Sequence, residues 1–208
     1  MMRKLLILIA LIVGVSISNE VAAQPRLRTE WGLVAGASYP ISKFEMGDCG
    51  ATVKLQLGWS AGMHMALKFG RGFAIQPEII YTYAKLNIND AGQKFSAEAT
   101  TNTLQVPILF SFRLGSTFRL NAGPVLTVVD NPIYNDRNNE PVMFGRLYPT
   151  VTYAVGIGVC LWKHLLIDLR AMSRFNTTTN YISYDVKSEG KEIKSTIHNI
   201  QLKVGYLF

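Results

Sequence analysis

After residue 23 the sequence has no run of about 18 consecutive apolar residues, the length expected of a helix that crosses a membrane. This absence excludes a helical membrane protein. Charged residues are scarce, at 17%, while 49% of the residues are hydrophobic. A composition this apolar leaves two classes, a soluble globular protein or a membrane β-barrel.

Cysteine and histidine are also rare. The chain has two cysteines, Cys49 and Cys160, and three histidines. Without a CxxC pair they give no metal-ligand spacing, so we expect no metal site. Export would permit a disulfide. We nevertheless expect none, because the strand pattern described below places Cys49 in an outer loop and Cys160 near the opposite end of a strand.

Other ligand classes lack their sequence signals. The glycines lie in strands or turns, not in a phosphate-binding loop. Basic residues are dispersed among acids and form no stripe for nucleic acid. The Asp- and Asn-rich stretch 130–140 lacks the spacing and central glycine of a calcium loop. We therefore expect no cofactor and no nucleic-acid partner.

The N-terminus carries an export signal. Arg3 and Lys4 precede an apolar run from Leu5 to Val15, and small residues at 21–23 form a cleavage site. This order is typical of a secretory signal peptide. A membrane anchor is the alternative, but the run is shorter than the ~20 residues that a span needs. We expect a signal peptide at 1–23 and one β-barrel domain at 24–208.

The rest of the chain alternates between apolar and polar residues, as strands with two different faces do. Eight strands are predicted, at about 31–39, 57–69, 73–88, 99–113, 117–129, 150–162, 165–175 and after 194. Short turns near 70–72, 115–116 and 163–164 alternate with longer loops at 40–56, 89–98, 130–149 and 176–194. Outer-membrane barrels have this pattern of short periplasmic turns and longer outer loops.

The predicted fold is therefore all-β, an eight-stranded antiparallel up-and-down transmembrane β-barrel with both termini in the periplasm. A secreted β-sandwich is the alternative, but it gives no reason for loop lengths to alternate. Aromatic residues support the barrel, because they sort into two girdles at the lipid–water interfaces. The periplasmic girdle contains Trp31, Phe69, Phe73, Phe112, Phe118, Tyr206 and Phe208, and the outer girdle Tyr39, Trp59, Tyr81, Tyr83, Tyr153 and Phe175.

The last strand ends on its apolar face. Its alternate residues are Ile200, Leu202, Val204, Tyr206 and Phe208. A terminal Phe with Tyr two residues earlier resembles the assembly signal of bacterial outer-membrane barrels. It implies the outer membrane of a Gram-negative cell, with membrane lipids and, during biogenesis, the barrel-assembly machinery as partners.

A wider resemblance covers nearly the whole chain after the signal peptide. Its motifs are the segments 76–81 (QPEIIY), 104–109 (LQVPIL), 122–124 (AGP) and 168–170 (DLR). Their order and spacing resemble those of the PorT-type outer-membrane β-barrel family of Bacteroidetes-like bacteria. The resemblance identifies a barrel family and not one activity. Some proteins of this kind take part in type IX secretion, so a role in protein secretion is implied by analogy.

Charged residues are predicted inside the barrel. His64, Glu78, Asp168, Arg170 and Lys203 share the inward parity, and Arg113 and Arg119 lie nearer the periplasmic rim. An eight-stranded barrel is just wide enough for side chains to fill, so these charges should pair as a packed polar core. The alternative is a salt-bridge gate across a narrow pore.

Three functions remain open from the sequence. The first is a structural or interaction subunit of an envelope assembly with a protein partner, linked to type IX secretion. The second is a narrow gated channel for ions or small solutes. The third is a lipid-modifying enzyme, for which His198 has Ser195, Asp185 and Glu189 nearby. His198 has lipid-side parity and no Gly-x-Ser-x-Gly elbow accompanies it, so we expect no catalytic residues and no enzyme.

Overall fold

A computed structural model describes residues 28–45, 51–70, 72–90, 94–115, 117–143, 145–146, 148–174, 178–183 and 191–208. The predicted signal peptide and its cleavage site, Cys49 and Phe175 lie outside the described residues. No helix in the described part of the chain has the length and apolarity needed to cross a bilayer.

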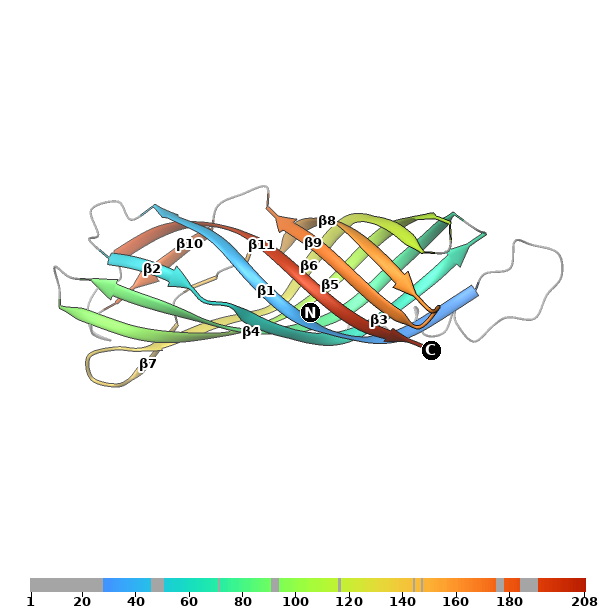
Figure 1. Ribbon diagram of the computed structural model, residues 1–208. Helices are drawn as coiled ribbons and strands as arrows, with labels where there is room; N and C mark the ends of the chain where they lie inside the picture. The colour runs from blue at the N-terminus through green and yellow to red at the C-terminus, as the bar shows by residue number, and fades with distance from the viewer. Residues whose placement is uncertain are drawn as a thin grey trace, which may run out of the picture.

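The described residues form antiparallel strands (Figure 1). Their bounds are β1 Arg28–Glu45, β2 Ala51–Leu55, β3 Gly58–Phe69, β4 Phe73–Asp90, β5 Phe95–Leu114, β6 Phe118–Asn135, β7 Pro141–Met143, β8 Val151–Leu161, β9 Leu165–Ser173, β10 Thr178–Ile182 and β11 Lys191–Leu207.

Eight of these strands form a closed ring. They follow the order β1-β3-β4-β5-β6-β8-β9-β11, and β11 pairs back to β1 from Gly32↔Leu207 to Glu45↔Lys194. Successive strands of this ring are neighbours and run antiparallel, as in an up-and-down barrel. The prediction of an eight-stranded antiparallel barrel is confirmed.

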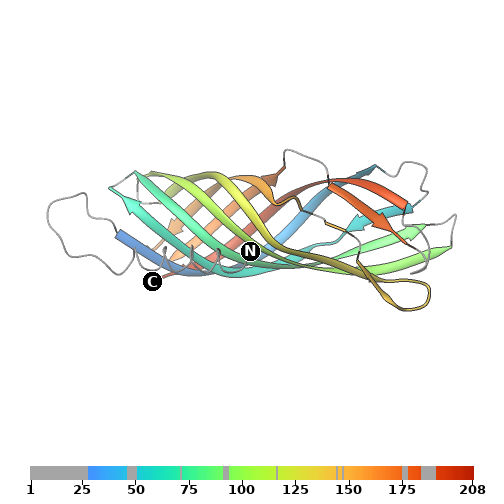
Figure 2. The same ribbon diagram turned by 180° about the vertical axis from the view of Figure 1, so that it is seen from behind.

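The two ends of the barrel differ. The short connections between β3 and β4, between β5 and β6, and between β8 and β9 lie at the end that carries the C-terminus. The strands β2, β7 and β10 lie at the opposite end (Figures 1 and 2). Since outer-membrane barrels have short periplasmic turns, we call the end with the C-terminus the periplasmic end and the other the outer end.

The predicted loop bounds at the outer end are wrong. β1 continues to Glu45, β6 continues to Asn135, and β11 begins at Lys191, and β2, β7 and β10 lie within predicted loops. The strands also extend into the predicted loop 89–98, since β4 ends at Asp90 and β5 begins at Phe95. The polar residues in these segments belong to strands whose outer face is in water, not to loops.

An exchange of polarity between the two faces explains the error. On β4 the outward residues are aromatic or aliphatic up to Tyr83 and then become polar, at Lys85 and Asn87. The inward residues change in the opposite sense, so Leu86 and Ile88 are fully buried. Within the membrane an apolar face contacts lipid, whereas beyond it the apolar face must turn inward, away from water. The exchange therefore marks the outer boundary of the membrane.

Beyond this boundary the barrel divides into two sheets around an apolar core. β1 and β3 pair only as far as Ser38↔Gly58. Above that level β2-β4-β5-β6-β7 form one sheet, and β10-β11-β1 form the other. We call the residues between them the outer core. They are Val53, Leu86, Ile88, Phe95, Ala99, Tyr134, Tyr148, Ile182 and Ile197.

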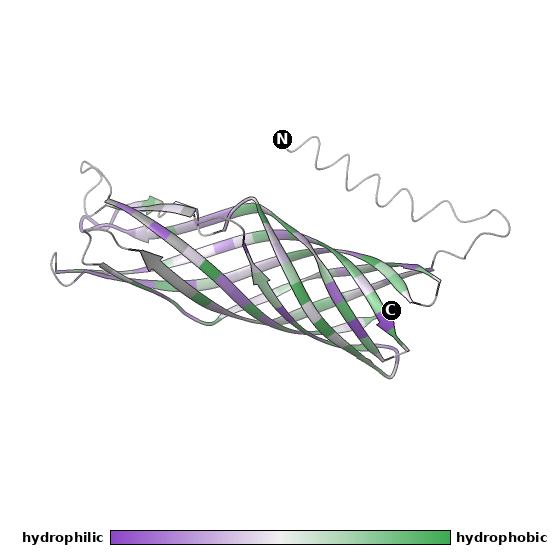
Figure 3. Cartoon of the chain, turned by 90° about the horizontal axis from the view of Figure 1, so that it is seen from above, coloured by the Kyte–Doolittle hydropathy of each residue, from purple (hydrophilic) through white to green (hydrophobic). Residues whose placement is uncertain are grey.

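The lipid-facing wall carries both aromatic girdles. At the outer girdle, the ring of Trp59 lies 5.7 Å from Tyr81 and 5.8 Å from Tyr83, between ring centroids. At the periplasmic girdle, Phe73 lies 5.5 Å from Phe112. Figure 3 shows green, hydrophobic bands across the strands of the half nearest the C-terminus. The register predicted for the membrane-spanning strands is therefore correct on this face.

Candidate functional site

A buried charge network fills the periplasmic half of the lumen. Its side chains come from five strands, β3, β4, β6, β9 and β11, all at inward positions of the alternation. Six of the seven predicted lumen residues belong to it, and Asn121, which we did not predict, joins them. The lumen charge network therefore comprises His64, Glu78, Arg119, Asn121, Asp168, Arg170 and Lys203.

Glu78 lies at the centre of the network. Arg170 donates through Nη1 to Oε2 at 2.8 Å and through Nη2 to Oε1 at 3.1 Å. Lys203 Nζ donates to Oε2 at 2.9 Å, and His64 Nδ1 lies 3.0 Å from Oε1. Both carboxylate oxygens are thus satisfied twice. At most 2% of each of these side chains is exposed, so the pairs lie in a low dielectric.

Asp168 extends the network toward β6. Its Oδ1 lies 3.2 Å from Arg170 Nη2, and its Oδ2 accepts a hydrogen bond from Asn121 Nδ2 at 2.7 Å. Arg119 Nη2 is 3.9 Å from Oδ2, too far for a hydrogen bond. The Arg119 side chain lies over Gly158, where an added Cβ would be 2.7 Å from Nε. Gly158 therefore makes room for this guanidinium.

Arg113 does not join the network. Its Nη2 donates to Glu30 Oε1 at 3.1 Å, and Lys68 Nζ contacts the other oxygen of Glu30. This second group lies nearer the periplasmic mouth, where the Arg113 side chain is 21% exposed. Sequence reasoning missed Glu30 because the first strand was predicted to begin at residue 31. Its partner Lys68 has the same parity on β3 as His64, which was predicted to point inward.

The network and the outer core close the lumen at two levels. In the periplasmic half, charged side chains pair across the interior. In the outer half, Leu86, Ile88 and Ile197 are almost fully buried in the outer core. Among the described residues, no group of three or more His, Cys, Asp or Glu side chains is placed to hold a metal ion. Side chains therefore pack the described interior at both levels.

The outer core also holds a buried phenol. Tyr148 N donates to Asp130 Oδ2 at 2.6 Å, and Asn199 Nδ2 lies 3.4 Å from the Tyr148 hydroxyl. Burial, aided by the Asp130 carboxylate, raises the pKa of Tyr148 well above its usual value of 10.0. The neutral phenol is therefore the form that the folded outer core holds.

The residues considered for catalysis are only partly described by the structure. Asp185, Glu189 and the side chain of Ser195 lie outside the described residues. His198 is exposed on the outer wall, and its Nδ1 lies 2.7 Å from Ser173 Oγ on the neighbouring strand. Sequence reasoning missed Ser173, because cross-strand pairing rather than proximity in sequence brings it to His198. This contact is a hydrogen bond at the rim of the lipid-facing wall.

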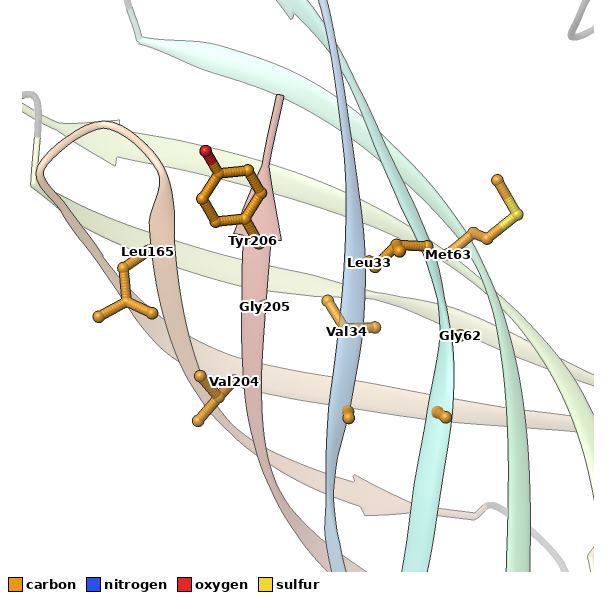
Figure 4. A pocket seen from close by; sticks show the side chains of 10 residues that line it. Leu33, Val34, Gly62, Met63, Leu165, Val204, Gly205 and Tyr206 are labelled. Carbon is orange, nitrogen blue, oxygen red and sulfur yellow. The ribbon is translucent and has the colours of Figure 1, made fainter.

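The same wall has a shallow apolar groove over β3, β1 and β11. Figure 4 shows the side chains of Leu33, Met63 and Tyr206 around it, with Gly62 and Gly205 among the lining residues. Small residues hollow the surface where the bulky neighbours stand higher. The lining is almost wholly apolar, as suits the lipid chains expected as neighbours.

The residues of the predicted assembly signal lie on this wall as well. Ile200, Leu202, Val204, Tyr206 and Phe208 are all exposed, and Phe208 N donates to Trp31 O at 2.8 Å. Tyr206 and Phe208 lie 5.4 Å apart, edge to face. Recognition of this stretch during assembly stays a prediction.

The closed ring, the apolar outer wall and the filled polar interior define a small outer-membrane β-barrel. Comparison with protein families agrees, since residues 18–131, more than half of the chain, match the family described as outer membrane protein beta-barrel domain. The chain belongs to this family, which places it in the outer membrane. A comparison with curated proteins found no match.

Solved structures show the same fold at low sequence identity. Ail, the attachment invasion locus protein of Yersinia pestis, solved with the heparin analogue sucrose octasulfate, aligns with a TM-score of 0.53 and 11% identity over 88% of this chain and all of its own. OprG of Pseudomonas aeruginosa aligns with a TM-score of 0.51 and 10% identity, covering 90% of this chain and 99% of its own. AlkL aligns with a TM-score of 0.51 and 12% identity, covering 92% and 95% respectively.

Proposed function

We propose that this barrel is a structural and interaction subunit of an envelope assembly, and that it acts through its outer end. One observation carries the proposal. The lumen is filled at two levels, whereas the outer end is built as two sheets around their own core. Because side chains pack the interior at both levels, we assign the function to the surfaces that the barrel presents.

The outer end has the properties of a platform for contact. Tyr134 joins its two sheets, because the hydroxyl donates to Ser183 O and accepts from Ser183 N, both at 2.7 Å. Ile133 and Met143 are paired across β6 and β7, and they are 39% and 57% exposed. They lie beyond the change of polarity and therefore outside the lipid. Apolar side chains exposed to water on a rigid surface favour a protein partner.

The link to type IX secretion is the finer part of the proposal. It is supported by the resemblance of the segments 76–81, 104–109, 122–124 and 168–170 to the PorT-type family, and by membership of the broader barrel family. A stable partner would be a membrane-anchored or secreted protein of that machinery, bound at Ile133 and Met143.

The test is a mild-detergent pull-down of the tagged protein from native membranes, followed by mass spectrometry. We expect a stoichiometric partner with the wild type and its loss with the double variant Ile133→Asp, Met143→Asp. The matched control is Asn89→Asp, which adds charge at an exposed outer-end position on β4 and should retain the partner. A wild-type barrel that elutes without a partner would refute the proposal. A partner outside the secretion machinery would refute only its finer part.

A further inference from the structure

Two arginines face each other directly across the β5–β6 hairpin. Arg113 and Arg119 are cross-strand partners, and both side chains point into the lumen. Like charges directly opposite on neighbouring strands destabilise a sheet. Arg113 is offset by Glu30, as described above. Among the described residues, Arg119 has the 3.9 Å approach to Asp168 as its one ion pair, and it must share Asp168 with Arg170 and Asn121.

The Arg119 guanidinium is buried, and it makes no hydrogen bond within the described part of the chain. The residue is 3% exposed, and Nε, Nη1 and Nη2 have no hydrogen-bond partner there. Arg113 Nε and the buried hydroxyl of Ser111, which precedes Arg113 on the inward face of β5, lack one as well. Buried donors are nearly always satisfied in folded proteins, charged ones above all. Three neighbouring residues on one patch of the inner wall thus present unused donors.

The charged side chains around these donors carry a net positive charge. Among the described side chains of this half of the lumen, the cations are Lys68, Arg113, Arg119, Arg170 and Lys203, and the carboxylates are Glu30, Glu78 and Asp168. With His64 neutral, the cations exceed the carboxylates by two. An excess positive charge in a region of low dielectric attracts an anion strongly.

We propose that the periplasmic half of the lumen binds a small oxyanion of the phosphate or sulfate class between Arg113 and Arg119, with Ser111 as a further donor. Two guanidinium planes and a hydroxyl supply the multiple N–H and O–H donors that a tetrahedral oxyanion accepts. The ligand enters from the periplasmic mouth, where Arg113 is partly exposed. A lipid phosphate is excluded, because the patch lies on the inner wall and the strands separate it from the bilayer.

The test uses the full folded barrel in a non-ionic detergent, with the arginine Nε–H signals followed by NMR during titration with inorganic phosphate at constant ionic strength. We expect saturable shifts of the Arg113 and Arg119 signals. Arg113→Gln, at the more exposed position, should fold and raise the apparent Kd for phosphate at least tenfold. Arg119→Gln should do the same where it folds. Arg146→Gln, at an exposed outer-end position, is the control and should bind like the wild type.

Sodium chloride at matched ionic strength separates specific binding from charge screening. Equal shifts with chloride and phosphate, or shifts that do not saturate, would overturn the proposal. An Arg113→Gln barrel that binds phosphate as tightly as the wild type would overturn it too. Neither result depends on a partner at the outer end, so this proposal and the proposed function can fail independently.

Discussion

Arg170 and Glu78 form a bidentate ion pair across the lumen, although 92 positions separate them in the sequence. The two N–O distances are 2.8 and 3.1 Å, and both side chains are at least 98% buried. Closure of the barrel brings β4 and β9 to opposite sides of the same narrow interior. Formation of this ion pair therefore depends on closure of the whole ring and not on one hairpin.

Removal of either partner should destabilise the barrel strongly. Arg170→Ala leaves Glu78 with two of its three partners, and Glu78→Ala leaves two cations without their shared carboxylate. Breaking a buried pair costs about 3–5 kcal/mol, which urea unfolding in lipid vesicles would measure. The double variant should lose less stability than the two single variants together. It removes the guanidinium and the carboxylate at once, so neither is left buried without the other.

The exposed pair of Lys85 and Glu98 on the outer end is the control for this measurement. Lys85→Ala should leave the unfolding midpoint unchanged, because an exposed ion pair is screened by water and salt. If Arg170→Ala proved as harmless as Lys85→Ala, the lumen charge network would have no part in stability.

The wild-type barrel should show no steady conductance in planar bilayers. The charge network blocks the periplasmic half and the outer core blocks the outer half, so Glu78→Ala alone should remain closed as well. Single-channel recording at both polarities measures this. Regular, discrete openings of the wild type would contradict the closed lumen and favour the gated channel. Openings of Glu78→Ala alone would show that the outer core does not seal the barrel.

Tyr134→Phe should loosen the outer end without affecting the membrane-spanning part. The variant removes the hydroxyl that holds both backbone groups of Ser183, and a lost hydrogen bond costs about 1 kcal/mol. Hydrogen exchange of the amides of β10 should accelerate several-fold, whereas exchange in β3 and β8 should stay constant. Tyr81→Phe is the control, since its hydroxyl donates to Asn102 at an exposed position. Unchanged exchange in β10 would exclude Tyr134 as the link between the sheets.

Tyr148 should make the outer core sensitive to alkali. Burial raises its pKa in the folded state above the unfolded value of 10.0. The stabilising effect is therefore complete below pH 10.0 and is lost as the pH rises from there toward the folded pKa. Subtracting the tyrosinate absorbance of Tyr148→Phe from that of the wild type should reveal a group that ionises late. A difference titration centred on the ordinary tyrosine pKa would show that the phenol is solvated.

The membrane-spanning part of the barrel was predictable from the sequence. Alternation with period two fixes which residues share a face, so the lipid-facing aromatics and the inward positions of Glu78, Arg170 and Lys203 followed from parity alone. The short turns at 70–72 and 163–164 fixed the order of the strands. These are local signals, because a single strand or a single connection contains each of them.

The outer end and the pairing inside the lumen depended on the tertiary structure. Polar residues such as Asn89 and Asn131 indicated loops, because a strand in water cannot be told from a loop until the apolar face it covers is known. The partner of Glu78 also lay beyond sequence reasoning. Parity placed several cations inside, but the stagger of the closed barrel decided that Arg170 and Lys203 reach Glu78, while Arg113 reaches Glu30.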